Sequence, residues 1–460
     1  MIISEIRYNE VIDRLRFDAE FYKPEYLKAE EVVKKIPHTK PLGELTTSII
    51  NGIDIREFMT TGIPYLRVGD MQEIFVNIDI ASKVRANSIV KKEIKLKEGD
   101  LLFARKGTVG ITCVATPDII DAIISTEVIR VRLKEINPYY VALFFNSNYG
   151  RKQLLRISSG AINPVITRDL FKSILIPIPP FSFQQKIELI VKDAYNKRKE
   201  ADEKYKQAEV LLNKALGIEK LELKDEKIFE IGFDEVESVL RFDADFYKQI
   251  FILSLNTLKN GENKGIFSVK KLEEISKISK GIEVGSDAYV DEGKLFLRVS
   301  NITEREITIS DNAKFIRENL FNELKSKYKP MPGEVLYTKD ATVGIAFPVD
   351  DNFNDAIISG GIIRIKPHDD LDQYYLSLVL NSILCRSQAE RQSIGAVIKH
   401  YTYFKIKDLL IPIIPKETQR QISNLIRQSF NLRKEAKELL GEAKKEVEEF
   451  IEKNTNYNRY

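Results

Sequence analysis

The side chains in this sequence that are best suited to chemistry are basic and polar residues on glycine-containing turns. Arg105, Lys106 and Thr108 follow an apolar run and surround a glycine. Arginine and lysine donate hydrogen bonds to guanine edges and to phosphates, and threonine can contact either. A charge on a turn is often only solvated. We nevertheless take as candidate DNA contacts the residues of this kind on turns and at the ends of apolar runs: Arg67, Arg105, Lys106, Thr108, Arg168, Arg298, Lys339, Thr342, Lys399, His400 and Tyr401.

Motifs of catalytic sites are weak in this sequence. The segment 137–140, Asn-Pro-Tyr-Tyr, resembles the NPPY motif of amino-methyltransferases only superficially, because its second proline is missing and no glycine-rich cofactor loop precedes it. An asparagine followed by proline at a helix start explains the segment sufficiently. The acidic positions Asp118 and Asp350 have no Glu-x-Lys partner of the kind a nuclease metal site needs. We therefore expect no catalytic residue, and no enzymatic activity of the chain by itself.

Cysteine and histidine usage indicates neither a metal site nor a disulfide framework. The only two cysteines, Cys113 and Cys385, lie far apart without a nearby cluster of ligands, so they should be buried small hydrophobic residues. The three histidines, His38, His368 and His400, occupy unlike sequence contexts. The sequence thus predicts no metal and no cofactor.

Composition is that of a globular protein with more than one domain. The chain has 460 residues, of which 43% are hydrophobic and 30% charged, and no apolar run reaches the length of a membrane span. The charged first residues do not resemble a secretory signal, so we expect a cytoplasmic protein. The net charge of +3 neither requires nor excludes nucleic acid, so a DNA site must come from locally placed charge.

An internal repeat organises the whole chain. Residues 15–23, LRFDAEFYK, return as LRFDADFYK at 240–248, an offset of 225, and residues 99–111 return at 333–345, an offset of 234. From the Tyr-Tyr pair at 139 onward the offset stays at 235. This pattern indicates a duplicated unit whose framework is held by packing while some loops have changed. Because the loops differ most, the two halves should recognise different things; the alternative is that the loop drift has no function.

The repeated motif also predicts an aromatic face in each half. Its aromatic residues fall at i, i+4 and i+5 in a segment of helical character. Two copies of a framework surface imply two copies of a partner, although these aromatics could instead be core. The candidate partner-binding residues are Phe17, Phe21, Tyr22, Phe242, Phe246 and Tyr247.

The remaining pattern predicts an α+β domain in each half. Short runs rich in Ile, Val, Phe and Tyr, such as 63–68, 100–104 and 128–133, indicate strands. A helix is expected over 139–155, followed by a loop, a short helix and a closing strand.

Two long helices are predicted by glycine-free and proline-free stretches dense in Lys, Glu, Gln and Ala. They cover about 183–216 and 417–452, the second interrupted only by Gly441. In a heptad, Ile187, Ala194 and Ala201 share one column, and the corresponding column at offset 235 contains Ile422, Ser429 and Ala436. Small residues on a seam let two backbones approach closely, so we expect an intramolecular antiparallel pair. The alternative is that each helix covers its own domain.

At this point the sequence resembles a known family, the type I restriction-modification specificity subunits (HsdS). The resemblance rests on three features that occur twice in the same order: the GD(I/L)L-x-x-(R/K)-x-x-T-V-G-I-like hairpin, the S-x-G-A loop at 158–161 and 393–396, and the I-P-rich segment before each long helix. An acidic residue, common in the family before the glutamine at the helix start, is replaced by Phe183 and Thr418.

The resemblance implies an organisation and a set of partners. It implies a first target recognition domain over 1–182, a central helix over 183–217, a linker over 218–225, a second such domain over 226–415 and a C-terminal helix over 416–455. It further implies that the chain reads a bipartite, asymmetric site on double-stranded DNA and positions two methyltransferase subunits and restriction/translocase subunits. The competing interpretations are a two-domain scaffold that does not bind DNA, and an enzyme with an unrecognised site.

Overall fold

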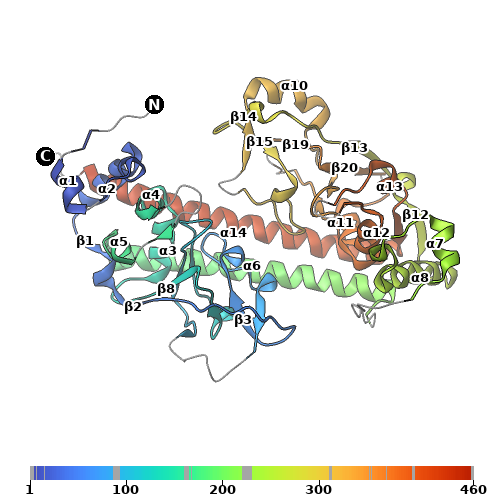
Figure 1. Ribbon diagram of the computed structural model, residues 1–460, viewed down its shortest axis with the longest axis horizontal. Coiled ribbons are helices and arrows are strands. Elements are labelled where there is room, and N and C mark those ends of the chain that lie inside the picture. The colour runs from blue at the N-terminus through green and yellow to red at the C-terminus, as the bar shows by residue number, and fades with distance from the viewer. Residues whose placement is uncertain are drawn as a thin grey trace. The chain divides into compact units, whose positions relative to one another are not determined.

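The chain forms two compact units, and each contains parts of both long helices. The computed structural model describes residues 5–6, 8–14, 16–85, 94–159, 165–166, 168–219, 230–309, 313–351, 353, 355–368, 370–395 and 399–456. Unit 1 consists of Met1–Arg198 with Lys434–Tyr460, and unit 2 consists of Lys199–Arg433. Figure 1 labels their elements along the chain.

Unit 1 is built on two sheets that helices cover. The first has four antiparallel strands in the order β2-β8-β5-β6, and the second has the order β4-β3-β7 with β3 and β7 parallel. The strands are β1 (Thr39–Pro41), β2 (Thr46–Asn51), β3 (Ile63–Leu66), β4 (Ser82–Val84), β5 (Leu101–Ala104), β6 (Thr112–Val114), β7 (Ile123–Ile124), β8 (Val128–Leu133), β9 (Ser158–Ser159), β10 (Val165–Ile166) and β11 (Leu175–Pro177). The helices are α1 (Tyr8–Arg14), η1 (Ala19–Tyr22), α2 (Pro24–Lys34), α3 (Pro138–Asn146), α4 (Asn148–Ile157) and α5 (Arg168–Lys172).

Unit 2 repeats this plan. Its two larger sheets have the orders β13-β20-β17-β18 and β14-β16-β15-β19, and α10 (Glu318–Tyr328) follows β16 in the chain. The other strands are β12 (Ser268–Lys271), β13 (Ser276–Lys280), β14 (Tyr289–Val290), β15 (Lys294–Leu297), β16 (Lys314–Ile316), β17 (Val335–Thr338), β18 (Ala346–Pro348), β19 (Ala356–Ile358), β20 (Ile362–Pro367) and β21 (Leu410–Ile413). The other helices are α7 (Phe233–Val239), η7 (Ala244–Tyr247), α8 (Gln249–Asn263), α9 (Leu272–Ile275), α11 (Gln373–Asn381), α12 (Ile383–Gln392) and α13 (Tyr403–Lys407). The predicted α+β tandem repeat is therefore confirmed.

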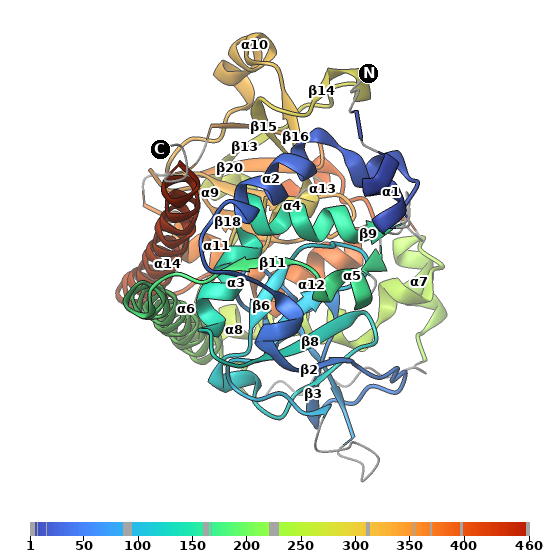
Figure 2. The same cartoon turned by 90° about the vertical axis from the view of Figure 1, so that its left-hand side faces the viewer.

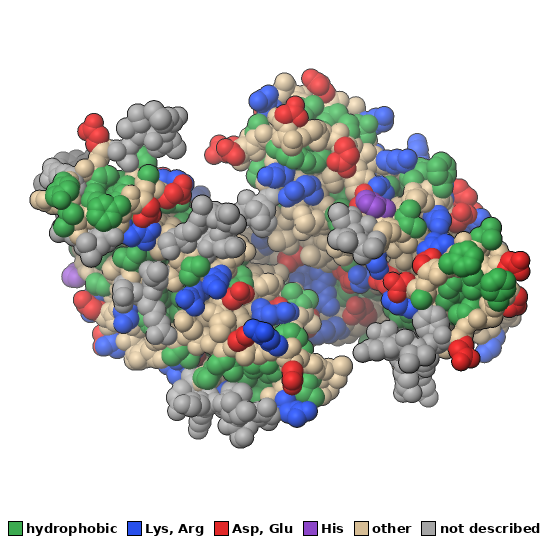
Figure 3. Space-filling model, viewed as in Figure 1, with side chains coloured by type: hydrophobic (Ala, Val, Ile, Leu, Met, Phe, Trp, Pro, Cys, Tyr) green, Lys and Arg blue, Asp and Glu red, His purple; other side chains and the backbone are tan. Residues whose placement is uncertain are grey.

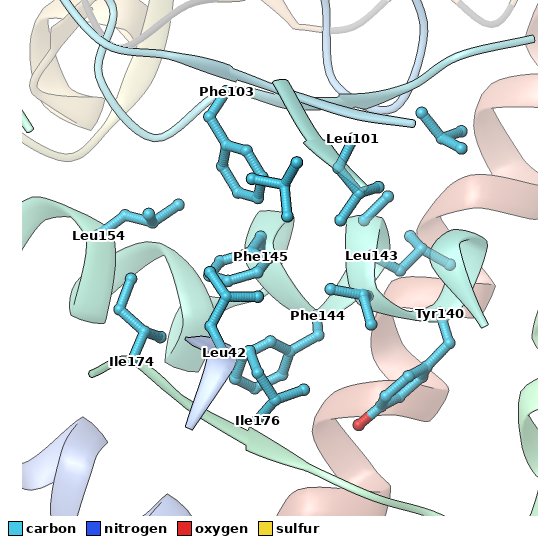
Figure 4. Close-up of a cluster of buried hydrophobic side chains, with 14 of the residues drawn as sticks. Leu42, Leu101, Phe103, Tyr140, Leu143, Phe144, Phe145, Leu154, Ile174 and Ile176 are labelled. Carbon is cyan, nitrogen blue, oxygen red and sulfur yellow. The ribbon is translucent and has the colours of Figure 1, made fainter. Parts of the chain in front are cut away.

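The core of unit 1 lies between its four-stranded sheet and α3. Phe103 on β5 meets Phe145 on α3 edge to face, with ring centroids 4.8 Å apart. Leu101, Leu143 and Phe144 surround this contact, as Figure 4 shows. Nearly every side chain of α3 is buried, which explains why the sequence of this helix shows no polar face.

The single helix predicted over 139–155 is wrong, because the chain breaks at Ser147. This residue is extended (φ −74°, ψ 163°) and its hydroxyl oxygen accepts a hydrogen bond from the Gly150 amide, which starts α4. Gly150 packs so closely on α3 that a Cβ atom would lie 2.2 Å from the Phe144 carbonyl oxygen. A serine cap and a close backbone contact thus separate α3 from α4.

Within each unit, one segment of α6 (Phe181–Leu216) packs against one segment of α14 (Lys416–Asn456). In unit 1, Lys197 pairs with Glu435 and Lys186 with Glu446, so the two segments run antiparallel. In unit 2, the buried Ser429 hydroxyl donates a 2.7 Å hydrogen bond to the Ala201 carbonyl oxygen. Figures 1 and 2 both show the two helices side by side, and the predicted antiparallel pair is confirmed. None of the helices in the described residues has the length and apolar character needed to cross a membrane.

Candidate nucleic-acid interface

The hairpin that carries the first candidate residues turns between β5 and β6. Gly107 and Gly110 both have positive φ, +75° and +98°, so the turn uses glycine where other residues are strained. Lys106 and Thr108 are exposed at its tip and Arg105 is half-buried. The Ile166 amide donates a hydrogen bond to the Arg105 carbonyl oxygen, which holds β10 against the turn.

The matched hairpin of unit 2 lies between β17 and β18 and has the same backbone contacts. The Tyr401 amide donates to the Lys339 carbonyl oxygen over 2.7 Å, as Ile166 does to Arg105. Ala341 adopts φ +57° at the position of Gly107, and its amide donates to the Lys399 carbonyl oxygen. The framework of the two turns is therefore shared although their side chains differ.

The side chains of the unit 2 turn form a charged cluster that joins two distant segments. The Nδ1 atom of His400 lies 2.8 Å from Asp340 Oδ1, and Lys339 Nζ lies 2.5 Å from the other carboxylate oxygen. In unit 1 the positions of Asp340 and His400 are occupied by Lys106 and Val165, which form the same backbone bridge. The two turns thus present different chemistry on one backbone.

Arg67 and Arg298 occupy matched positions at the ends of β3 and β15. The Arg67 amide donates to the carboxylate of Asp70, and the Arg298 amide donates to the side-chain oxygen of Asn301, so each closes a short 3-10 turn. The guanidinium of Arg67 is exposed and lies 5.4 Å from the Phe58 ring centroid, whereas Arg298 is half-buried.

A buried ion pair supports the hairpin in each unit. In unit 1, Arg132 donates two hydrogen bonds of 2.7 Å to the Asp100 carboxylate, which is 1% exposed, and Arg130 lies 3.9 Å away. The hydrogen bond to Asp100 raises the pKa of Arg132, whereas burial lowers the pKa of Arg130. In unit 2, Glu334 and Arg364 match Asp100 and Arg130 and lie 3.7 Å apart. These charges stabilise the sheet from which the turns project.

The four remaining predictions for DNA contact have different outcomes. Tyr401 is a correction: it is 1% exposed and its hydroxyl donates to the Lys405 carbonyl oxygen, so its ring belongs to the core. Lys399 and Thr342 are exposed on the unit 2 turn and stay candidates. Arg168 starts α5, and the structure describes its backbone only. Parts of both S-x-G-A loops, 158–161 and 393–396, lie outside the described residues.

The predicted aromatic face is wrong for four of its six residues. Phe21 and Tyr22 are buried in η1, and so are Phe246 and Tyr247 in η7. Phe21 lies under the guanidinium groups of Arg16 and Arg156, at 4.8 and 4.3 Å from its ring centroid. The 3-10 turn, rather than an α-helix, places these rings in the core. The remaining two residues, Phe17 and Phe242, are 75% and 79% exposed.

The Asn-Pro-Tyr-Tyr segment has a structural role in unit 1. The Asn137 side-chain oxygen accepts hydrogen bonds from the amides of Tyr139 and Tyr140, which caps α3. Its Nδ2 donates to Glu188, and its amide donates to the Gln184 side chain at the start of α6. In unit 2, Asp372 caps α11 in the same way. The segment therefore positions a helix.

The cysteines and the acidic side chains give little support for metal binding or nucleophilic attack. In the described part of the chain, no three His, Cys, Asp or Glu side chains gather as a group that could hold a metal ion. Cys113 and Cys385 are buried free thiols. Burial raises the pKa of Cys385 to about 12 and also raises that of Cys113, so both are poor nucleophiles.

Residues that sequence reasoning missed lie where β13 ends. Lys280 and Gly281 line a hollow together with the Lys339, Asp340 and His400 cluster. A Cβ atom at Gly281 would lie 2.1 Å from the Ser359 carbonyl oxygen, and one at the matched Gly52 would lie 1.9 Å from that of Ile124. The Gly-Ile dipeptide repeated at 52–53 and 281–282 is the signal that could have pointed to this edge.

Comparison with known proteins identifies the family. The family model described as type I restriction modification DNA specificity domain matches residues 39–210 and 266–442. The chain is 24% identical over 453 residues to a protein described as a putative type I restriction enzyme MjaX specificity subunit from Methanocaldococcus jannaschii, covering 93% of this chain and 96% of that protein.

Two solved structures are also similar to this chain. The type I restriction-modification S subunit from M. genitalium aligns over 91% of this chain and 96% of that one, with 10% identity and a TM-score of 0.40. The HsdS subunit from Thermoanaerobacter tengcongensis aligns over 91% and 97%, with 18% identity and a TM-score of 0.29. Because the family model matches both repeats, and together most of the chain, this protein belongs to the type I restriction-modification specificity-subunit family.

Proposed function

We propose that this chain reads a bipartite, asymmetric site on double-stranded DNA, one half-site with each unit. The observation that supports the proposal most directly is the pair of matched turns. Their backbones make the same contacts, yet one presents Lys106 beside Val165 and the other Asp340 beside His400. Different donors and acceptors on the same framework would prefer different base edges. Unlike half-sites follow from this difference.

The test is selection of duplexes from a random-sequence library by the purified full chain together with its methyltransferase subunits. We expect two unlike short motifs separated by a spacer of indifferent sequence. Changing Lys106 to Ala should alter or weaken one motif only. A single continuous motif, or no enrichment, would contradict the proposal and favour a scaffold that does not bind DNA.

We further propose that the chain is non-catalytic and positions methyltransferase and restriction/translocase subunits. Two observations support this proposal. Both cysteines are buried thiols, and the described residues contain no group of three His, Cys, Asp or Glu side chains that could hold a metal ion. The purified chain, incubated with labelled S-adenosylmethionine or with Mg²⁺ and a DNA substrate, should neither methylate nor cleave it. Methyl transfer by the chain alone would contradict this proposal.

The exposed aromatic residues favour two docking sites for methyltransferase subunits. Figure 3 shows hydrophobic side chains on the surface over α1 and over α7. Exposed aromatic residues of unit 1 include Tyr8 (76% exposed) and Phe17, and at the offset of 225 unit 2 has Phe233 (73% exposed) and Phe242. Aromatic residues exposed at the same place in two repeats fit two copies of one partner.

A double variant tests the docking proposal. Phe17→Ser with Phe242→Ser should reduce co-purification of the methyltransferase subunits, because both exposed anchors are lost. The matched control is Phe58→Ser, which changes an exposed phenylalanine elsewhere in unit 1. Full assembly by a correctly folded double variant would rule out docking at these residues.

A further inference from the structure

Two hollows of unit 2 meet at the end of β13. The first is lined by the charged cluster of the turn and by the β13 end, and the second by the β13 end and by residues of α10 and β20. Because Lys280 and Gly281 line both hollows, the two are adjacent and together form one surface region. We call this the unit 2 groove and define it by Lys280, Gly281, Lys327, Arg364, Asp340 and His400.

On one side of the unit 2 groove, His400 is an exposed and oriented imidazole. Its side chain is 57% exposed, whereas Asp340 is 23% exposed. A carboxylate only accepts hydrogen bonds, so the 2.8 Å contact places the hydrogen of the neutral ring on Nδ1. The Nε2 atom is then an acceptor. Two backbone hydrogen bonds with Ile394, of 2.7 and 3.0 Å, hold the residue in place.

On the other side, the unit 2 groove is cationic. Lys280 and Lys327 are exposed, and the described residues lining this side include no carboxylate. The Lys280 ammonium lies 4.4 Å from the Tyr403 ring centroid, a contact that orients the side chain. Arg364 lies deeper, donating to the Lys329 carbonyl oxygen and paired with Glu334. Exposed ammonium groups suit contact with phosphate oxygens.

The matched positions of unit 1 carry different chemistry. Val165 replaces His400, Lys106 replaces Asp340, and Asn51 replaces Lys280. Glu127 occupies the position of Gly361 in unit 2. The Glu127 carbonyl oxygen accepts a hydrogen bond from the Arg105 amide, and the Gly361 carbonyl oxygen accepts one from the Lys339 amide. The oriented imidazole is therefore a feature of unit 2 alone among these matched positions.

We propose that the unit 2 groove reads one base and its neighbouring phosphate. His400 Nε2 accepts a hydrogen bond from the exocyclic amino group of an adenine or a cytosine in the major groove, where both bases present a donor. Asp340 is the positioning residue that orients the ring, and Lys280 and Lys327 contact the phosphate. This inference rests on the proposed function and names the base-reading residue of one half-site.

The experiment is the same duplex selection, with the full chain and its methyltransferase subunits, on variants of the groove residues. His400→Val should lower the preference for adenine or cytosine at one position of one half-site by about fivefold to tenfold, the worth of one hydrogen bond. The other half-site should be unchanged. Asp340→Ala should lower the same preference, and Asp340→Asn, which keeps an acceptor oxygen for Nδ1, should retain most of it.

Lys280→Ala should behave differently, because a phosphate contact carries no base information. Affinity should fall alike for all sequences, and the slope of log affinity against log salt should become shallower by about 1. His368→Val is the matched control, since it removes an exposed histidine of unit 2 that does not line the groove and should leave both half-sites unchanged. Thermal unfolding followed by circular dichroism checks that each variant is folded.

A reciprocal graft tests the inference from the other side. Lys106→Asp combined with Val165→His rebuilds the acid and imidazole pair in unit 1, and should introduce a preference for an amino-bearing base in the other half-site. Unchanged base preferences in folded His400→Val would overturn this inference alone. A lost preference for guanine instead would overturn the acceptor assignment. No enrichment by the wild-type chain would overturn the proposed function with it.

Discussion

Units 1 and 2 share the packing of their repeated Arg-Phe-Asp segment and differ at the tips of their turns. In unit 2, Phe246 lies under Arg241 and Arg391, at 4.6 and 4.1 Å, as Phe21 lies under two arginines in unit 1. Tyr22 and Tyr247 each donate a hydrogen bond to the carbonyl oxygen of the arginine six residues before. Buried contacts of this kind tolerate little change. Exposed turn residues lack that constraint, so Lys106 and Asp340 can differ at one position of the shared backbone.

The two units also differ in the number of arginine partners of their buried carboxylates. Asp100 accepts two short hydrogen bonds from Arg132. In unit 2 the position of Arg132 is occupied by Lys366, which is exposed. Glu334 depends on Arg364 and on a 2.9 Å hydrogen bond from the Met331 amide. Unit 1 therefore relies more on buried charge than unit 2 does.

Truncation of the shared phenylalanines should have the largest effect and should be equal in the two units. Phe21→Ala and Phe246→Ala should each lower the free energy of unfolding by about 3–5 kcal/mol, because each removes a buried ring and leaves a cavity. Hydrogen exchange resolved by peptide would assign the loss to one unit at a time. As a control, Phe17→Ala should cost less than about 0.5 kcal/mol, since this ring is exposed. Unequal losses would mean that the repeated packing is not equivalent.

Neutralising the buried carboxylate should destabilise unit 1 more than unit 2. Asp100→Asn should destabilise unit 1 by about 3 kcal/mol, because Arg130 and Arg132 would lose their counter-charge in a buried site. Glu334→Gln should cost unit 2 about 1 kcal/mol, because Glu334 lacks the two hydrogen bonds that Arg132 donates to Asp100. Denaturant unfolding combined with hydrogen exchange measures both. Equal costs would show that the geometric difference between the pairs has no energetic consequence.

A smaller asymmetry is expected on the helix seam. Ser429 of unit 2 donates a hydrogen bond to Ala201 across the helix pair, and the matched position in unit 1 is Ala194. Ser429→Ala should cost about 1 kcal/mol, the net worth of one buried hydrogen bond. The reverse change, Ala194→Ser, would place a hydroxyl in the apolar seam and should cost at least as much. A higher unfolding temperature of Ser429→Ala would show that this hydrogen bond does not stabilise the helix pair.

The smallest effect should come from the turn backbones. Gly107 has φ +75° and a Cβ atom there would contact nothing within 4 Å, so Gly107→Ala tests backbone strain alone. It should cost about 1 kcal/mol. Ala341→Gly, which relaxes the matched position in unit 2, should change stability by less than about 0.5 kcal/mol, because lower strain is offset by greater freedom of the unfolded chain. A stabilisation by Gly107→Ala would contradict this account.

Much of the fold could be predicted from local patterns. Strands β3, β5 and β8 lie within the runs 63–68, 100–104 and 128–133. Helices α6 and α14 cover the two stretches that were predicted as long helices, 183–216 and 417–452. Gly441 does not interrupt α14, because both neighbouring turns continue the helical hydrogen bonding and tertiary packing outweighs its weak propensity. The break at Ser147 was missed because serine is also tolerated within helices, and only its extended backbone reveals the cap.

The candidate site could be predicted only in part. The turns, their glycines and His400 are visible as repeated or polar loop positions in the sequence. Burial of Phe21 and Tyr401 was not, because an aromatic residue reads the same in a sequence whether its ring is in the core or on the surface. The contribution of Lys280 was missed because it ends a strand with no distinguishing motif of its own.

By itself, the sequence determined the duplication, the α+β character of each repeat, the two long helices and the family. These depend on periodicity and on matches between aligned segments, which are local properties of the chain. Only the tertiary structure decided that Asp340 meets His400, 60 residues away, that Lys280 completes the same groove, and that four of the six repeated aromatics are core. The physical reason is that these contacts join segments through strand pairing and packing, whose partners no local pattern specifies.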